Sequence, residues 1–369
     1  MSGTKNSIDS TDPIPRNKSS PVRIAFLGGP KTGKTSIISQ LVTKHYRETY
    51  YPLRKTNPVL YTYRPSAALV PILDPLDKNA HEILGAQDSN LILSPVMKHG
   101  LSRTNADAST TSLSEIAQTL AKNKVYHVNT SSNQTAKTVT PILTELIDTP
   151  AFEPDRSVPF LEVSLHAKLA KDVLRNLAND AGHSVNAEPL LVASGAAELN
   201  GAIDGYVLVY SAVPPAQIPA YDADSKVLQP TKTSLSDLPV IRDGLIEAWS
   251  EYYMYRTQHS SCGESDIFSL KNAFKNMFDT KVKKEVPLRG KPESISQDPY
   301  DKLCLPPILI VCTHKNLPLM SPNLIEQGKN YAKQWNCSFI AVDASENVDI
   351  TLDLMLREII ERREARKTK

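Results

Sequence analysis

The chain has 369 residues, of which 40% are hydrophobic and 22% are charged, and its formal net charge is +2. This length is sufficient for one large domain or two ordinary ones with a sizeable core. So small a net charge argues against nucleic acid as a partner, because phosphate-driven binding needs a concentrated basic face. No apolar run approaches the roughly 20 residues of a membrane helix, so we expect no intrinsic membrane anchor.

The cysteines and the two ends of the sequence indicate a cytoplasmic protein. Four cysteines are scattered without metal-ligand spacing, at Cys262, Cys304, Cys312 and Cys337. This pattern is typical of reduced thiols in the cytosol rather than of disulfides or a zinc site. Residues 1–21 have no apolar core and predict a flexible N-terminal segment, not a secretory signal. The sequence ends without the cysteine of a prenylation signal.

In chain order, the apolar pattern predicts strands that alternate with helices. Residues 22–29, VRIAFLGG, form a continuous apolar run typical of a strand buried on both faces, and residues 36–44 show helical spacing. Further strands are expected at 59–65 and within 141–150, 203–213, 306–316 and 337–344, and further helices at 159–180, 238–255, up to about 336, and 349–363. This alternation predicts an α/β fold with a mainly parallel sheet and helices on both faces.

Two polar stretches interrupt this pattern. Residues 66–140 lose regular periodicity and are rich in Ser, Thr and Asn, so we interpret most of them as a long disordered insertion with one helix near 113–122. Residues 260–303 form a second candidate insertion. The predicted organisation is therefore a single domain over 22–369 with two insertions. Its last helix should bury one face, formed by Leu352, Met355 or Leu356, Ile359 and Ile360.

A phosphate-binding loop is predicted between the first strand and the first helix. Gly28-x-x-x-x-Gly33-Lys34-Thr35 matches the whole Walker A pattern of P-loop NTPases in the context that the pattern requires. Backbone N–H groups and the helix N-terminus would bind phosphate, Lys34 would reach the β- and γ-phosphates, and Thr35 would bind Mg²⁺. A chance glycine turn is the alternative. The predicted phosphate contacts are Gly28, Gly29, Pro30, Lys31, Thr32, Gly33, Lys34, Thr35 and Ser36.

Two residues of this loop are unusual. Pro30 has no backbone N–H to donate, so one phosphate contact is absent if that position normally supplies one. Lys31 adds positive charge near the site.

The segments that follow the loop carry a family resemblance. With IDTP, IDGYVLVYSA, VCTHKN and FIAVDASENVDI following in that order, the chain resembles the Ras-like small GTPases. The resemblance covers most of the ordered segments but neither the insertions nor the N-terminus. It implies GTP or GDP with Mg²⁺ as cofactors, and protein effectors or regulators as partners.

The stretch KHYRETYYPL resembles the first switch of that family. Tyr46 and Tyr50 fall on its two aromatic positions, which pack by the guanine and over the phosphates. Leu53 stands where the family has a threonine that senses γ-phosphate through Mg²⁺, unless Thr56 substitutes through a shifted register. Ordinary packing against the sheet is the alternative for the tyrosines.

The second switch departs further from the family pattern Asp-x-x-Gly-Gln. Asp148 stands at the metal-binding position, although an aspartate at a strand end can also serve a turn. Ala151 takes the glycine position, whose N–H meets the γ-phosphate. Phe152 replaces the glutamine that orients the attacking water, and Glu153 lies one position off. No residue is therefore assigned as catalytic.

Base recognition is only partly retained. The family's Asn-Lys-x-Asp corresponds to Thr313, His314, Lys315 and Asn316. Asn316 has one acceptor and one donor, so guanine binding is weakened and xanthine could be preferred; a simple turn cap is the alternative. A last contact to the base, or a helix cap, is expected from Asp343, Ala344 and Ser345.

The sequence therefore predicts a guanine nucleotide-binding Ras-like protein with slow or defective GTP hydrolysis that acts in signalling or trafficking through partner binding. The alternatives are a GTPase whose active site a partner completes, a non-switching interaction scaffold, and, more distantly, a P-loop kinase. The kinase would need a lid of arginines, and only isolated Arg156 and Arg175 follow DTP.

Overall fold

The computed structural model describes residues 21–46, 49, 51–53, 56–74, 76–77, 79–86, 88–105, 125–130, 137–152, 203–215, 233–246, 249, 298, 304–346 and 348–368. Several expected features lie outside these residues. They are Tyr50, Glu153, Cys262, the flexible segment 1–20, the helices at 113–122 and 159–180, and nearly all of the second insertion at 260–303.

A seven-stranded mixed sheet forms the centre of the fold, in the order β2-β6-β1-β7-β8-β9-β3. The parallel strands are β6 (Ile142–Asp148), β1 (Val22–Leu27), β7 (Gly205–Ser211), β8 (Ile308–Thr313) and β9 (Ser338–Ala341). The two edge strands, β2 (Asn57–Tyr63) and β3 (Leu91–Ile92), pair antiparallel with β6 and β9. The predicted α/β class with a mainly parallel sheet is confirmed.

Alternation along the strands builds one hydrophobic core on each face of the sheet. In β7, Val207 and Val209 point into one core, whereas Tyr206, Leu208 and Tyr210 point into the other. Helices α1 (Lys34–Thr43) and α12 (Asp349–Thr368) contribute to the first core. The second core contains side chains of α11 (Pro322–Trp335) and of residues 237–246, which follow the short helix η2 (Ser234–Ser236). Helices therefore cover both faces, as expected for a sheet with buried parallel strands.

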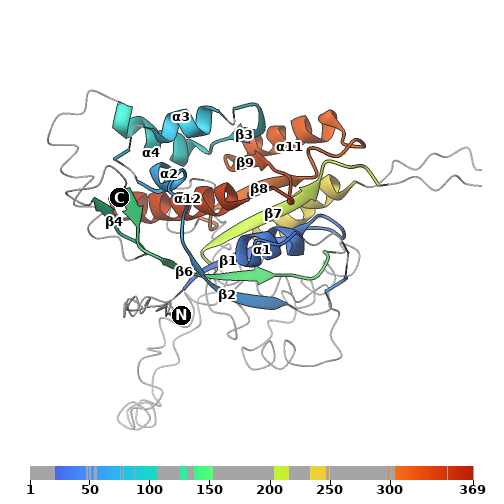
Figure 1. Cartoon of the computed structure of the whole chain (residues 1–369). Coiled ribbons are helices and arrows are strands. Elements are labelled where there is room, and N and C mark those ends of the chain that lie inside the picture. Colours follow the sequence, from blue (N-terminus) through green and yellow to red (C-terminus); the bar gives the residue numbers. More distant parts are fainter. Residues whose placement is uncertain are drawn as a thin grey trace, which may run out of the picture.

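Residues 66–105 are regular, and the expectation of a disordered segment here was wrong. They form α2 (Val70–Leu73), α3 (Ala80–Gly85), η1 (Asp88–Asn90), β3 and α4 (Pro95–Asn105). Figure 1 shows α2, α3 and α4 together at the end of the molecule opposite β2. A small hairpin of β4 (Val128–Thr130) and β5 (Lys137–Val139) leads into β6. α2 and α3, with four and six residues, are too short to give the repeated apolar spacing that marks a helix in sequence.

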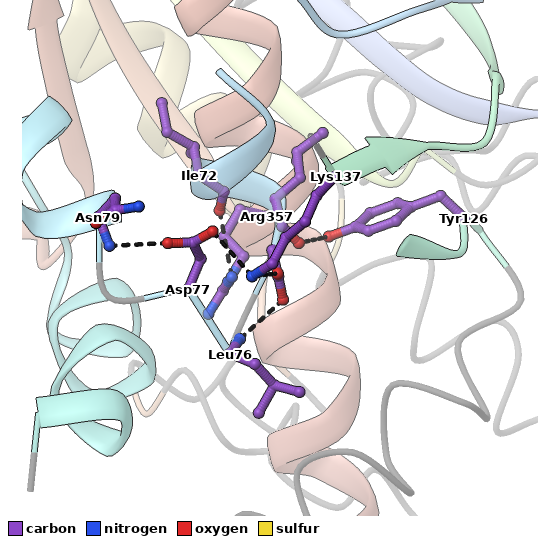
Figure 2. A network of polar contacts seen from close by, with 9 residues as sticks. Ile72, Leu76, Asp77, Asn79, Tyr126, Lys137 and Arg357 are labelled. Atoms are coloured by element: carbon purple, nitrogen blue, oxygen red, sulfur yellow. Dashed lines mark hydrogen bonds and ion pairs between the residues drawn. The ribbon is translucent and has the colours of Figure 1, made fainter. Parts of the chain in front are cut away.

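The helices α2, α3 and α4 form a layer over α12. A polar network connects this layer to α12 and to the hairpin (Figure 2). Lys137 Nζ lies 2.7 Å from Asp74 Oδ2 and 3.0 Å from Asp77 Oδ2. The hydroxyl of Tyr126 donates to the Leu73 carbonyl at 2.6 Å, and Arg357 donates to the Ile72 carbonyl at 3.2 Å.

The network also lowers the pKa of one of its carboxylates, that of Asp77. Burial raises the pKa of Asp77, but the Asn79 N–H and the Lys137 ammonium outweigh it and hold that pKa below its usual range. Asp77 is therefore charged at neutral pH and remains paired with Lys137.

Because this layer covers it, α12 is buried on more than the one face that its apolar residues predicted. Arg357 and Glu361 are 1% and 5% exposed and form an ion pair at 2.7 Å, one helical turn apart. Arg362 and Glu358 make a second such pair at 3.1 Å. Gly100 of α4 lies so close that an added methyl group would stand 2.7 Å from the Glu361 carboxyl carbon. No helix in the described part of the chain is long and apolar enough to cross a membrane.

Candidate functional site

The glycine loop, residues 28–33, lies at the carboxyl end of β1, in the middle of the sheet. In the sheet β1 lies between β6 and β7: β2 and β6 extend the sheet on one side, and after β6 the chain crosses over β1 to β7 on the other side, where β8, β9 and β3 follow. Such a reversal of strand order opens a crevice at the carboxyl ends of the strands, where ligands of open α/β sheets bind. The fold thus places the loop at its most favourable position for a ligand.

Close packing against the neighbouring strand requires glycine at the start of the loop. A methyl group on Gly28 would stand 2.1 Å from the carbonyl oxygen of Val209 in β7. Gly33, at the entry to α1, has φ 89°, a left-handed conformation that favours glycine. Lys31 adopts a left-handed conformation as well, with φ 57°. The loop is therefore held in a shape that an ordinary turn sequence would not adopt.

Lys34 lies inside this loop. Its ammonium donates to the carbonyl oxygens of Gly28 at 2.7 Å and Gly29 at 2.9 Å, and the side chain is buried. Burial lowers the pKa of Lys34 to about 8, against the opposing attraction of the Asp148 carboxylate. The loop therefore contains a partly desolvated cation whose charge a bound anion would stabilise.

A pocket of about 280 Å³ opens beside Lys34. Its described lining carries two lysines and several hydroxyl groups but no carboxylate or amide side chain. The lining residues are Pro30, Lys31, Thr32, Gly33, Lys34, Thr35, Ser36, Tyr46, Thr49, Tyr51, Leu53, Thr149, Ala151 and His314. This chemistry suits an anionic ligand that is rich in oxygen acceptors.

The strand end after β8 is tied directly to the loop. The hydroxyl of Thr313 donates to the Thr32 carbonyl at 2.8 Å. His314 follows with φ 61°, and its Nδ1 lies 2.8 Å from the hydroxyl of Ser211. Burial lowers the pKa of His314, although the Asp343 carboxylate opposes this effect, so the ring is neutral at pH 7.

Most residues of the predicted phosphate site therefore meet in one place, but only some residues of the two segments predicted to be switches line the pocket. Tyr46, Leu53 and Ala151 line the pocket, whereas Thr56 is not in the described lining. Phe152 points away: its side chain is buried in the second core, and its N–H donates to the Gly28 carbonyl at 3.0 Å. Asp148 is buried next to Lys34.

Of the residues expected at the base, His314 lines this pocket, whereas Asn316, Asp343, Ala344 and Ser345 are not in its described lining. Asn316 is exposed, and its amide nitrogen donates to Glu346 Oε1 at 2.8 Å. Asp343 Oδ1 accepts from the Ser345 N–H at 3.0 Å and from the Ser345 hydroxyl at 2.7 Å, which fits the cap interpretation. Ala344 between them is buried.

Sequence reasoning missed three lining residues. Thr49 and Tyr51 belong to the same polar and aromatic run as Tyr46, and only the path of the chain brings them to the pocket. Thr149 directly follows Asp148, so its position after a strand end was an available signal. Its hydroxyl donates to the Phe26 carbonyl at 2.6 Å.

Comparison with known proteins gives a relative but no named activity. No family model matches the chain. The chain is 33% identical over 404 aligned positions to "Uncharacterized protein YPR084W" of Saccharomyces cerevisiae, and the alignment covers 93% of this chain and 88% of the yeast protein. The chain belongs to the family of this yeast protein. Since the yeast protein's name states neither ligand nor reaction, the functional argument rests on the site itself.

Proposed function

We propose that the chain is a divergent Ras-like guanine nucleotide-binding protein that binds GTP and GDP with Mg²⁺ in the glycine-loop pocket. The observation that carries the proposal is the buried Lys34 inside a Walker A loop that lies at the reversal point of a parallel sheet. Two lysines and the absence of carboxylates from the described lining favour a ligand with phosphate groups.

The donor set also fits a magnesium ion. Mg²⁺ prefers oxygen ligands, retains several waters and bridges to phosphates. The Thr35 hydroxyl in the pocket would bind it, and Asp148, buried beside Lys34 behind the described lining, would hold it through water. When bound, the ion would neutralise charge on the phosphates.

Slow hydrolysis is part of the proposal. An attacking water needs an amide or carboxylate to orient it, and the described lining contains neither. Phe152 is buried in the core, and Leu53 offers no oxygen to a metal. We therefore propose that the protein binds nucleotide for long periods and acts through protein partners in signalling or trafficking.

The experiment is a titration of the purified protein with mant-GTP and mant-GDP in the presence of Mg²⁺, combined with single-turnover phosphate release. Lys34→Ala should abolish binding, because it removes the cation inside the loop, whereas Lys44→Ala changes an exposed lysine outside the pocket lining and should not. Rapid phosphate release without a partner would refute slow hydrolysis. Absence of binding below about millimolar, equivalent to about 4 kcal/mol, would refute nucleotide binding and favour the scaffold.

A further inference from the structure

Left-handed backbone at residues other than glycine is concentrated at the pocket. Among the described residues, the non-glycine residues with positive φ are Lys31, Lys44, His314 and Asn336. Lys44 and Asn336 are the C-caps of α1 and α11, where a left-handed residue commonly ends a helix. Lys31 and His314 end no helix in the described part of the chain, and both line the pocket. The conformations that helix ends do not explain therefore lie at the pocket.

The neighbours of Lys31 hold its backbone in this conformation. The ring of the preceding Pro30 fixes its φ. The following Thr32 is buried; its hydroxyl donates to the Gly29 carbonyl at 3.0 Å, and its carbonyl accepts from Thr313 at 2.8 Å. Lys31 joins these two fixed residues with φ 57°, which glycine adopts more readily than lysine. The chain therefore carries a lysine where glycine would be less strained.

Strain of this kind in a binding loop indicates that the side chain has a function. Lys31 lies at the exposed part of the lining, whereas Lys34 is buried and donates to carbonyl oxygens inside the loop. A triphosphate carries more negative charge than a diphosphate, and its attraction to a nearby cation is correspondingly larger. Pro30 offers no N–H and Leu53 no oxygen for a metal, so Lys31 is the group of this lining that can respond to the added charge.

We infer that Lys31 is a specificity-determining residue for phosphate number: its ammonium binds the terminal phosphates and makes the pocket prefer GTP to GDP. The inference rests on the proposed nucleotide site and adds the means by which that site distinguishes its two ligands. The Walker A pattern leaves this position open, so the pattern itself does not assign this role to Lys31.

The test measures the affinities of the full chain for mant-GTP and mant-GDP at saturating Mg²⁺. The wild type should bind GTP more tightly than GDP. Lys31→Met removes the charge but keeps a long side chain, so the GTP-to-GDP affinity ratio should fall by about fivefold, as expected for one solvent-exposed ion pair. Lys31→Arg keeps the charge and should retain the ratio.

Lys31→Gly separates this role from a structural one. Glycine relieves the left-handed strain, so the melting temperature of the ligand-free protein should rise by about 2–4 °C, while the ratio falls as in Lys31→Met. A lysine that served only the shape of the loop would lose stability and selectivity together.

Lys44 provides a matched control. It is an exposed lysine with the same φ of 57°, and it does not belong to the described lining of the pocket. Lys44→Met should therefore leave the GTP-to-GDP ratio unchanged.

Each negative result has its own meaning. A wild type without preference for GTP, an unchanged ratio in Lys31→Met, or an equal fall in Lys44→Met overturns the role of Lys31 while nucleotide binding stands. A lower melting temperature in Lys31→Gly overturns the strain on which the role rests. A wild type that binds neither nucleotide overturns the proposed function and this inference together.

Discussion

The charge of Lys34 should make nucleotide binding depend on pH. Burial inside the glycine loop lowers its pKa to about 8 in the ligand-free protein. A bound polyphosphate favours the charged ammonium and therefore raises that pKa. The complex then holds more protons than the free protein, so affinity is highest below the free pKa and is lost as the pH rises through it.

The size of this effect follows from the pKa. The protonated fraction of Lys34 falls from roughly nine-tenths at pH 7 to roughly one-tenth at pH 9. Because only the protonated form binds well, the dissociation constant should rise about tenfold over this interval, or about 1.4 kcal/mol. The measurement is a mant-GTP titration at pH 7, 8 and 9 with saturating Mg²⁺ and constant ionic strength, since salt screens charge.

Matched variants isolate the contribution of Lys34. Lys34→Arg keeps a charge at every pH tested, so its binding, even if weaker, should be nearly independent of pH. Lys44→Arg changes an exposed lysine and should retain the wild-type profile. A flat wild-type profile, or an arginine variant as steep as the wild type, would refute the reasoning.

Two further predictions concern stability, measured as the free energy of unfolding in denaturant. Arg357→Met should cost about 3–5 kcal/mol because it leaves the buried Glu361 carboxylate without its partner. The double variant Arg357→Met/Glu361→Met should come within about 1 kcal/mol of the wild type. Equal losses in the single and the double variant would contradict this. Gly28→Ala should cost about 2–4 kcal/mol because its methyl group meets the Val209 carbonyl. Gly85→Ala, where nothing lies within 4 Å of an added methyl group, is the control and should be neutral or stabilising; a similar loss there would show that the contact is not the cause.

The parts of the fold that the sequence predicted are those whose pattern is local. β1, the glycine loop and α1 follow one another with a continuous apolar run, a glycine motif and helical spacing, and each has one dominant interpretation. β3 has two residues and is a strand only because it pairs with β9, so no local pattern marks it.

The burial of charged residues in the last helix, α12, could not be predicted from a local pattern either. Arg357, Glu358, Glu361 and Arg362 look in sequence like a solvated face, because charged residues usually are exposed. They pair inside the molecule because distant parts of the chain cover them: Ile72 of α2 and Gly100 of α4 lie against Arg357 and Glu361. Ser338 of β9 and Leu305 lie against Glu358 and Arg362. The Asn316 to Glu346 contact likewise joins two turns that lie far apart in sequence, and the strand order brings them together.

The layer formed by residues 66–105 also sets the order in which the chain can complete its fold. Leu91 and Ile92 pair with Ile340 and Phe339, and α2 and α4 pack on α12, the last helix of the chain. During synthesis this layer leaves the ribosome long before β9 and α12 exist, so its apolar side chains lack the partners that these elements supply until both have emerged. The fold is therefore completed only after α12 has been synthesised, and a chain that stops before α12 leaves both the layer and the sheet face without their shared core.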